Sequence, residues 1–310
     1  MRLRVKLADL LIKTAPEIYR KHITINRKGE TVLYVRALNA IYGIMKAALL
    51  FYQRFVGDLM TIGFELNPYD PYVANKTING KQLTVLWHVD DIKASHVEAK
   101  VVTRMTKWRR KTYKRLFKDG SGKIKLCRGK IHDYLGMNID YTIKGEVKIT
   151  MIPYIKEMIQ DFHKHDPNPD KKAITPAAEF LFKVDDESKL ISGSRARVFH
   201  TFVAKALFAT KRSRPDIHTA VAFLTTRVQG PKKDYWKKLL RLMQYLRDTT
   251  EIPLTLHADS TNIVQWWVDG FYAVHPDMRS QTGVTMLLGQ GSITGTSIKQ
   301  KMNTKSSTET

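Results

Sequence analysis

Two adjacent aspartates, Asp90 and Asp91, stand between apolar runs in the stretch "LTVLWHVDDIKASH" at residues 83–96. Neighbouring strand residues point to opposite faces, so both carboxylates could serve one site only where they splay at a hairpin tip. Such carboxylates hold the two ions of phosphoryl transfer, which lie about 3.5–4 Å apart and clamp the attacking and leaving oxygens. Aspartate is also a good turn residue, so an acidic turn without chemistry is the alternative.

The charge balance is the strongest feature of the composition. The 52 Lys and Arg residues outnumber the 29 Asp and Glu residues, which gives a net charge of +23. So basic a chain favours a polyanionic partner such as nucleic acid, because phosphate contacts release counterions. A solvated basic surface on a protein with another task is the alternative.

Length and composition exclude several other classes. The 310 residues suffice for about two domains. No apolar run approaches the roughly 20 residues that cross a bilayer, and the charged start "MRLRVKLADLLIK" is not a secretory signal. The single cysteine, Cys127, excludes an intrachain disulfide framework and a cysteine-rich zinc site.

Elements that could position the aspartates lie on both sides of them. Apolar residues at spacings of three and four predict an amphipathic helix at 38–60, in which Gly43 either allows close backbone approach or simply packs. Asn79-Gly80 predicts a type I′ hairpin between 71–78 and 81–89. A tighter hairpin is expected at 87–95 and another, around Lys144-Gly145, between 132–142 and 146–151.

Helices return after these hairpins. Pro153 suits the first turn of one helix, and further helices are expected at 196–212, 216–228 and 232–248, after a surface linker at 165–179. Three strands are then expected at 266–275, 282–289 and 291–299, with Ser306 or Ser307 as the N-cap of a following helix. Together the elements predict an α+β fold.

The last of these helices carries two distinct faces. Its expected buried stripe is Trp236, Leu239, Leu240, Met243 and Leu246. Lys233, Lys237 and Arg241 line another face, which is either a phosphate track or, as is more usual for one helix alone, an ordinary solvated face.

"HVDD" at 88–91, preceded by the helix "LNAIYGIMKAALLFY", resembles the reverse transcriptase of copia-type LTR retrotransposons, which carries a "YVDD" hairpin and an "LYGL-K-A-" helix. The resemblance continues in order through "DYLGMNI" and "KRSRPDIHTAVAFLTTRV" to "YWKKLLRLMQYLRDT". The segment at 267–309 is similar to the start of the family's ribonuclease H domain.

The resemblance implies a partial right-hand polymerase followed by half of a ribonuclease H-like α/β domain. By that reading, 1–152 is partial fingers and palm, 153–250 is a helical thumb and connection, and 251–310 begins the ribonuclease H domain. The implied activity is RNA-directed DNA polymerisation by two-metal nucleotidyl transfer. The implied compartment is intracellular, a cytoplasmic particle or the nucleus.

The family's metal ligands carry over to four carboxylates. Asp90 and Asp91 match the polymerase pair, and Asp269 and Glu309 match two carboxylates of the ribonuclease H site, with Mg²⁺ or Mn²⁺ as the implied ion. An exposed strand residue is the alternative for Asp269. A capping-box acid is the alternative for Glu309.

The implied partners are an RNA template, a DNA primer, their duplex and a deoxynucleoside triphosphate, with no membrane. Gly43 and Lys46 match the family's nucleotide- and template-contacting segment, and His88 would neighbour the primer terminus. Arg214, in the "RPDI" segment, is either structural or a duplex contact.

The sequence departs from the family in two places. The family's first palm aspartate should lie upstream, on a strand running into "AFL", whereas the first acidic residue is Asp9, in "VKLADLLIK", which reads as a helix or an edge segment. His88 replaces the family's usual aromatic residue, which puts primer positioning in question. The frame is expected to begin just after that strand and to end within the ribonuclease H domain.

Two hypotheses of different classes follow. One is a polymerase with an attached ribonuclease H. The other is a basic remnant that binds nucleic acid and catalyses nothing. We expect the 310-residue chain to extend no primer and to bind RNA–DNA duplex in a salt-sensitive, sequence-indifferent way.

Overall fold

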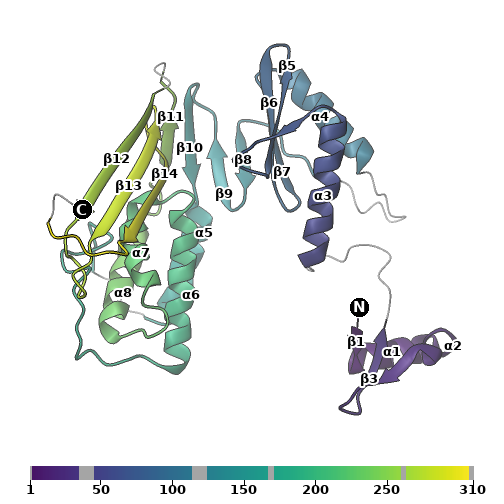
Figure 1. Cartoon of the computed structure of the whole chain (residues 1–310), viewed down its shortest axis with the longest axis horizontal. Coiled ribbons are helices and arrows are strands. Elements are labelled where there is room, and N and C mark those ends of the chain that lie inside the picture. Colours follow the sequence, from purple (N-terminus) through teal and green to yellow (C-terminus); the bar gives the residue numbers. More distant parts are fainter. Residues whose placement is uncertain (1, 35–44, 114–123, 167–170, 260–262, 307–310) are drawn as a thin grey trace. The chain divides into compact units, whose positions relative to one another are not determined.

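The computed structural model describes residues 2–34, 45–113, 124–166, 171–259 and 263–306 (Figure 1). Its contacts divide the chain into two units, Met1–Ile124 and Lys125–Thr310. Helices and strands occur in both units, and every ladder between described strands is antiparallel. The predicted α+β class is confirmed.

The first unit begins with a small sheet of order β1-β3-β2. Helix α1 (Val5–Thr14) packs Ala8 against Leu33 of β3 (Thr31–Tyr34). Asp9 lies in α1, so the helical alternative for its segment is confirmed. The remaining elements are β1 (Arg2–Arg4), α2 (Pro16–Tyr19), η1 (Arg20–His22) and β2 (Ile23–Ile25).

The second sheet of this unit has the order β4-β5-β6-β7 and carries the paired aspartates. Its strands are β4 (Glu65–Leu66), β5 (Val73–Ile78), β6 (Lys81–His88) and β7 (Asp91–Ser95). Two helices, α3 (Met45–Thr61) and α4 (Ala99–Thr112), share one core with it. The helix predicted at 38–60 is confirmed from residue 45 onward, whereas 38–44, including Gly43, lies outside the described residues.

Both hairpins predicted in this sheet are confirmed. Asn79 and Gly80 have φ of 51° and 68°, the positive values that a type I′ turn requires at both central positions. The β5–β6 and β6–β7 ladders then run without a break in register.

The second unit opens with a sheet of order β11-β10-β9-β8. Its strands are β8 (Ile131–Tyr134), β9 (Met137–Asp140), β10 (Glu146–Thr150) and β11 (Leu254–His257). The expectation of one strand at 132–142 is wrong, because a two-residue turn at Leu135-Gly136 divides it, with φ of 52° and 78°. Leucine carries no turn signature, so only the glycine hinted at this turn.

Four helices build the core of the second unit: α5 (Ile152–His163), α6 (Gly193–Thr210), α7 (His218–Thr225) after the short η2 (Pro215–Ile217), and α8 (Lys233–Asp248). Pro153 lies in the first turn of α5, as predicted. The stripe predicted on α8 is correct for Trp236, Leu239, Met243 and Leu246. Leu240 is only partly buried and Leu242 is fully buried instead, because the face that meets the core is wider than one stripe.

Another sheet of the second unit holds the last strands in the order β12-β13-β14 (Figure 1). The three consecutive strands were predicted, and they span β12 (Val264–Phe271), β13 (Gln281–Leu288) and β14 (Ser292–Lys299). Strand β14 packs on α7. The helix expected after Ser306 or Ser307 falls on 307–310, which lie outside the described residues. The predicted domain boundaries at 152 and 250 stay a prediction. Strand β10 ends before the first boundary, strand β11 begins after the second, and the two strands pair with each other.

Candidate functional site

The paired aspartates form the tip of the β6–β7 hairpin. His88 pairs with Asp91, so Val89 and Asp90 are the two loop residues. Val89 has φ of 54°, a left-handed conformation in which a β-branched side chain is strained by about 1–3 kcal/mol. Its side chain is 42% exposed, so core packing does not account for the strain. Strain of this kind concentrates where a loop must present functional groups.

Strand alternation places the hairpin tip on the sheet face opposite the core. Trp87 and Ile92 pair with each other and pack into the core that α3 and α4 share. The next pair, His88 and Asp91, therefore lies on the other face, and both residues are exposed. Asp90 is exposed at the tip itself.

Arg109 of α4 is a cationic group that the structure brings to the aspartates. Its Nη2 donates to the backbone oxygen of Asp90 over 3.5 Å, a long hydrogen bond. Burial lowers the pKa of Arg109, while the charges of Asp90 and Asp91 act in the opposite direction. The guanidinium thus offsets part of the negative charge of the pair. Sequence reasoning missed this residue, because nothing in the spacing of 19 residues points to it.

A second contact fixes the end of the helix that carries Arg109. The Tyr113 hydroxyl donates to Asp58 Oδ2 of α3 over 2.6 Å. Burial and this bond raise the pKa of Tyr113, and the same bond lowers the pKa of Asp58. The bond ties the C-terminal end of α4 to α3, and so holds Arg109 at the hairpin.

The open face beside the hairpin is largely polar. Asn75 Oδ1 accepts hydrogen bonds from Gln82 Nε2 over 3.1 Å and from Thr84 Oγ1 over 2.9 Å. Further toward the tip, Lys93 Nζ donates to Ser95 Oγ over 3.1 Å. This face offers hydrogen-bonding groups rather than an apolar surface.

The donor chemistry of the pair fits a hard divalent cation, because carboxylate oxygens are the ligands that Mg²⁺ prefers. Within the described part of the chain, no group of three or more His, Cys, Asp or Glu side chains is gathered as a metal site. The two carboxylates of Asp90 and Asp91 are of the right chemical type to bind one such cation. Two cations would need further ligands.

Asp269 lies in β12, which is exposed along its whole length. With His218, Thr219 and Ser297 it lines an open hollow of about 320 Å³. Burial lowers the pKa of His218, and the ammonium group of Lys211, 3.3 Å from its Nε2, does so further. Glu309 lies outside the described residues, so its distance from Asp269 is not tested.

The other predicted contact residues are scattered. Lys46 is exposed in the first turn of α3, and Lys233 and Lys237 are exposed on α8. Arg241 is half-buried and donates to Thr175 Oγ1 over 3.0 Å, so one of the three residues on this face of α8 is engaged within the protein.

Arg214 is enclosed in the second unit. Its side chain is 1% exposed and pairs with Asp216 at 2.7 Å. It also donates to the backbone oxygen of Thr249 over 2.9 Å, and the Tyr245 hydroxyl completes the group by donating to Asp216. The sequence left two roles open for Arg214, a structural one and a contact with the nucleic-acid duplex. These contacts favour the structural role.

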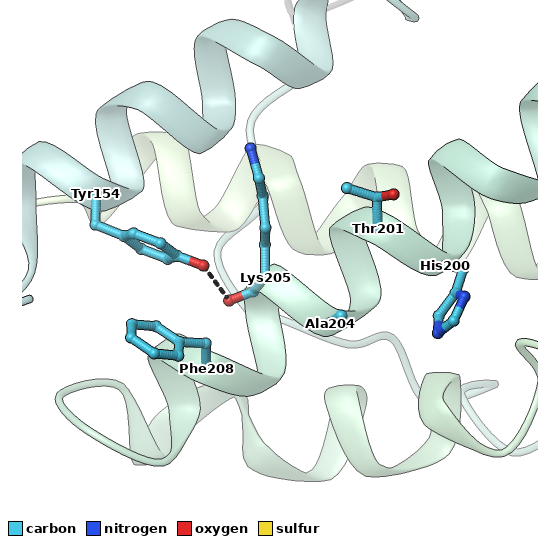
Figure 2. A pocket seen from close by; sticks show the side chains of 6 residues that line it. All are labelled: Tyr154, His200, Thr201, Ala204, Lys205 and Phe208. Atoms are coloured by element: carbon cyan, nitrogen blue, oxygen red, sulfur yellow. Dashed lines mark hydrogen bonds between the residues drawn. The ribbon is translucent and has the colours of Figure 1, made fainter. Parts of the chain in front are cut away.

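A separate hollow of about 530 Å³ lies between α5 and α6 (Figure 2). The rings of Tyr154 and Phe208 lie together at one end, with centroids 5.2 Å apart, and the Tyr154 hydroxyl donates to the backbone oxygen of Lys205 over 3.1 Å. Its lining residues are Tyr154, His200, Thr201, Ala204, Lys205 and Phe208. No carboxylate is among the described residues that line this hollow, and metal-dependent phosphoryl transfer needs such groups.

None of the described helices combines the length and the apolar character needed to cross a bilayer.

Comparison with known proteins finds relatives over most of the chain. The putative transposon Ty5-1 protein of Saccharomyces cerevisiae is 22% identical over 251 residues, which cover 80% of this chain and 77% of that protein. The retrovirus-related Pol polyprotein from transposon TNT 1-94 of Nicotiana tabacum is 23% identical over 285 residues, which cover 91% of this chain but only 21% of the polyprotein. No protein-family model and no solved structure matches the chain.

Proposed function

The chain is related to retrotransposon polyproteins over most of its length, and on this premise we propose that it is a reverse transcriptase region of the copia type. The observation that carries the proposal is the β6–β7 hairpin. It presents Asp90 and Asp91 at a strained tip, on the polar face of an antiparallel sheet whose other face packs on helices. We assign this sheet to a polymerase palm and α5–α8 to a thumb and connection.

In the proposed reaction, Asp90 and Asp91 would hold Mg²⁺ or Mn²⁺ through their carboxylate oxygens. The bound ion would lower the pKa of the attacking hydroxyl and neutralise charge on the transferred phosphoryl group. Arg109 positions the hairpin through the backbone of Asp90 and limits repulsion between the two carboxylates. We propose that His88, which pairs with Asp91 in the hairpin, contacts the primer terminus.

We assign the β12–β14 sheet to the start of a ribonuclease H domain. Asp269 would be one metal ligand there and Glu309 another. Exposure of Asp269 beside an open hollow supports this assignment, because a carboxylate without a buried partner is free to accept a metal ion.

A second candidate function is nucleic-acid binding without catalysis. It is favoured by the net charge of +23 and by the fact that, in the part of the chain that the structure describes, no third carboxylate gathers with Asp90 and Asp91, as two metal ions would need. The two candidates differ in primer extension, not in affinity for nucleic acid.

The test combines metal binding with primer extension. We expect Mn²⁺ to bind the chain, as measured by electron paramagnetic resonance, and the double change Asp90→Asn with Asp91→Asn to weaken that binding about tenfold or more, because it removes both anionic ligands. Glu65→Gln, an exposed acid on β4, is the matched control and should leave it unchanged.

Primer extension on an RNA template with Mg²⁺ or Mn²⁺ separates the two candidates. We expect the 310-residue chain to extend no primer, because the hairpin supplies two adjacent carboxylates and two-metal transfer needs further ligands; this result would favour binding without catalysis. Template-directed extension that disappears in Asp90→Asn would overturn that expectation and establish the enzyme. Mn²⁺ binding that the double change leaves intact would instead remove the hairpin as a metal site.

A further inference from the structure

Helix α4 carries a row of cations that the proposed reaction does not use. Lys100, Arg104, Lys107 and Lys111 follow one another at intervals of four, three and four residues, so they share one side of the helix. All four are exposed, and none forms an ion pair with another described residue. We refer to these four residues as the α4 stripe.

The α4 stripe lies apart from the aspartate hairpin. Val101 and Met105 bury the inner side of α4 in the core of the first unit, and Arg109 contacts Asp90 from one flank. Lys107 and Arg109 are two residues apart, which is about 200° around an α-helix. The stripe therefore lies on the flank away from the hairpin, and a ligand bound there is not the one held at the aspartates.

Helix stability alone does not explain this arrangement. Like charges three or four residues apart repel, and the stripe contains three such neighbouring pairs in succession. Lys100 stands in the first turn, where the helix dipole disfavours a cation, and no acidic residue of that turn offsets it. A bound polyanion would relieve both effects.

We infer that the α4 stripe is a second nucleic-acid contact, a track for the backbone of a strand outside the reaction site. From Lys100 to Lys111 it spans about 16 Å, or roughly five steps of a strand that rises 3.4 Å per nucleotide. The apolar side of α4 is buried in the core, so this helix has no free apolar face to insert into a membrane. The inference shares a nucleic-acid partner with the proposed function but does not depend on catalysis.

The test compares two variants that lose the same charge. One changes the stripe, by Lys100→Gln, Arg104→Gln, Lys107→Gln and Lys111→Gln. The matched control changes four exposed lysines that lie far apart in the sequence, by Lys28→Gln, Lys81→Gln, Lys144→Gln and Lys189→Gln. Affinity for a labelled single-stranded RNA of 20 nucleotides is measured by fluorescence anisotropy across a salt series, after circular dichroism has confirmed folding.

We expect the stripe variant to bind at least about tenfold more weakly at low salt, and its slope of log affinity against log salt to fall by about 3, since each lost contact removes about 0.7. The control variant should change far less. Equal losses in both variants would show a response to net charge alone and overturn the inference, as would unchanged affinity in the stripe variant.

Two measurements on the unaltered chain complete the test. Lysine acetylation should be slowed by the RNA at Lys100, Lys107 and Lys111 but not at Lys28 or Lys144, and equal modification with and without RNA would contradict the track.

Vesicles of anionic lipid should not protect these lysines, and protection by vesicles but not by RNA would assign the stripe to a membrane surface instead. Asp90→Asn should leave protection by RNA unchanged, which separates failure of this inference from failure of the proposed reaction.

Discussion

Individual residues act here through the partners that the fold gives them. Val89 accepts a strained backbone so that Asp90 reaches the hairpin tip, and Arg109 approaches from a helix 19 residues away. Arg214 differs from these residues, because its guanidinium is buried and binds Asp216 and the backbone of Thr249. A cation in a family motif therefore need not contact nucleic acid.

The buried position of Arg214 predicts a stability effect. Arg214→Ala should lower the free energy of unfolding by about 2 kcal/mol or more, because it removes an enclosed guanidinium together with its ion pair to Asp216 and its hydrogen bond to Thr249. Arg214→Lys should restore little of the loss, since an ammonium group cannot make the paired bonds of a guanidinium. Urea unfolding measures the change.

Arg212→Ala is the control for that experiment. Arg212 is half-buried over the ring of Phe208, so its loss should cost clearly less than the loss of Arg214. An Arg214→Ala protein that keeps its stability but loses affinity for RNA–DNA duplex would reverse the assignment and make Arg214 a duplex contact.

At the scale of elements, antiparallel sheets carry Asp90, Asp91 and Asp269. In the β12–β14 sheet a buried polar chain links neighbouring strands: His275 Nε2 lies 2.9 Å from Gln281 Oε1, and Gln281 Nε2 donates to Ser297 Oγ over 2.8 Å. His275 is 4% exposed and also meets the ring of Phe182 edge to face. This packing connects the sheet that carries Asp269 to the helical core.

The same histidine predicts how stability depends on pH. Burial lowers the pKa of His275 below its ordinary 6.5, an effect that Lys299 and Arg227 reinforce and that Gln281 and Asp277 oppose. Below pH 6.5 the unfolded chain then binds more protons than the folded one, so stability is fully present above that pH and declines as the pH falls. Thermal unfolding between pH 7.5 and pH 5 measures the decline.

His275→Gln is the matched change, since it keeps a side-chain donor for Gln281 and does not titrate. It should reduce the loss of stability at low pH without abolishing it, because burial also lowers the pKa of His218. A decline that is identical in the wild-type chain and in His275→Gln would contradict the role given to His275.

At the scale of the whole molecule, the chain forms two compact units and has a strongly positive net charge. The excess of basic residues is spread over both, and the candidate contacts at Lys46, Lys233 and Lys237 are all exposed. A field of this sign attracts phosphate without regard to base sequence.

We therefore predict salt-sensitive, sequence-indifferent binding to RNA–DNA duplex. If about six or more phosphates are contacted, the affinity should fall about 1,000-fold or more between 50 and 200 mM salt, because each contact releases a counterion. Anisotropy titrations with two duplexes of unrelated sequence measure both properties. A dissociation constant that stays the same across that range of salt would rule the prediction out.

Local signals account for what the sequence determined by itself. Asn79-Gly80 determined a turn because both positions need positive φ, and apolar spacings of three and four together with turn signals predicted the α+β class with most helices and strands. The ordered motifs identified a retrotransposon relationship that the comparisons confirm. The turn at Leu135 escaped notice because leucine gives no local signal for a left-handed backbone.

Only the tertiary structure decided which of these side chains meet. Arg109 at Asp90, Tyr113 on Asp58 and the enclosure of Arg214 join residues whose separation in the chain carries no information about contact. Spacing along a chain specifies a face of one helix or strand. Which face is closed by a neighbour, and which is left to solvent as on the outer flank of α4, depends on packing between elements distant in the sequence.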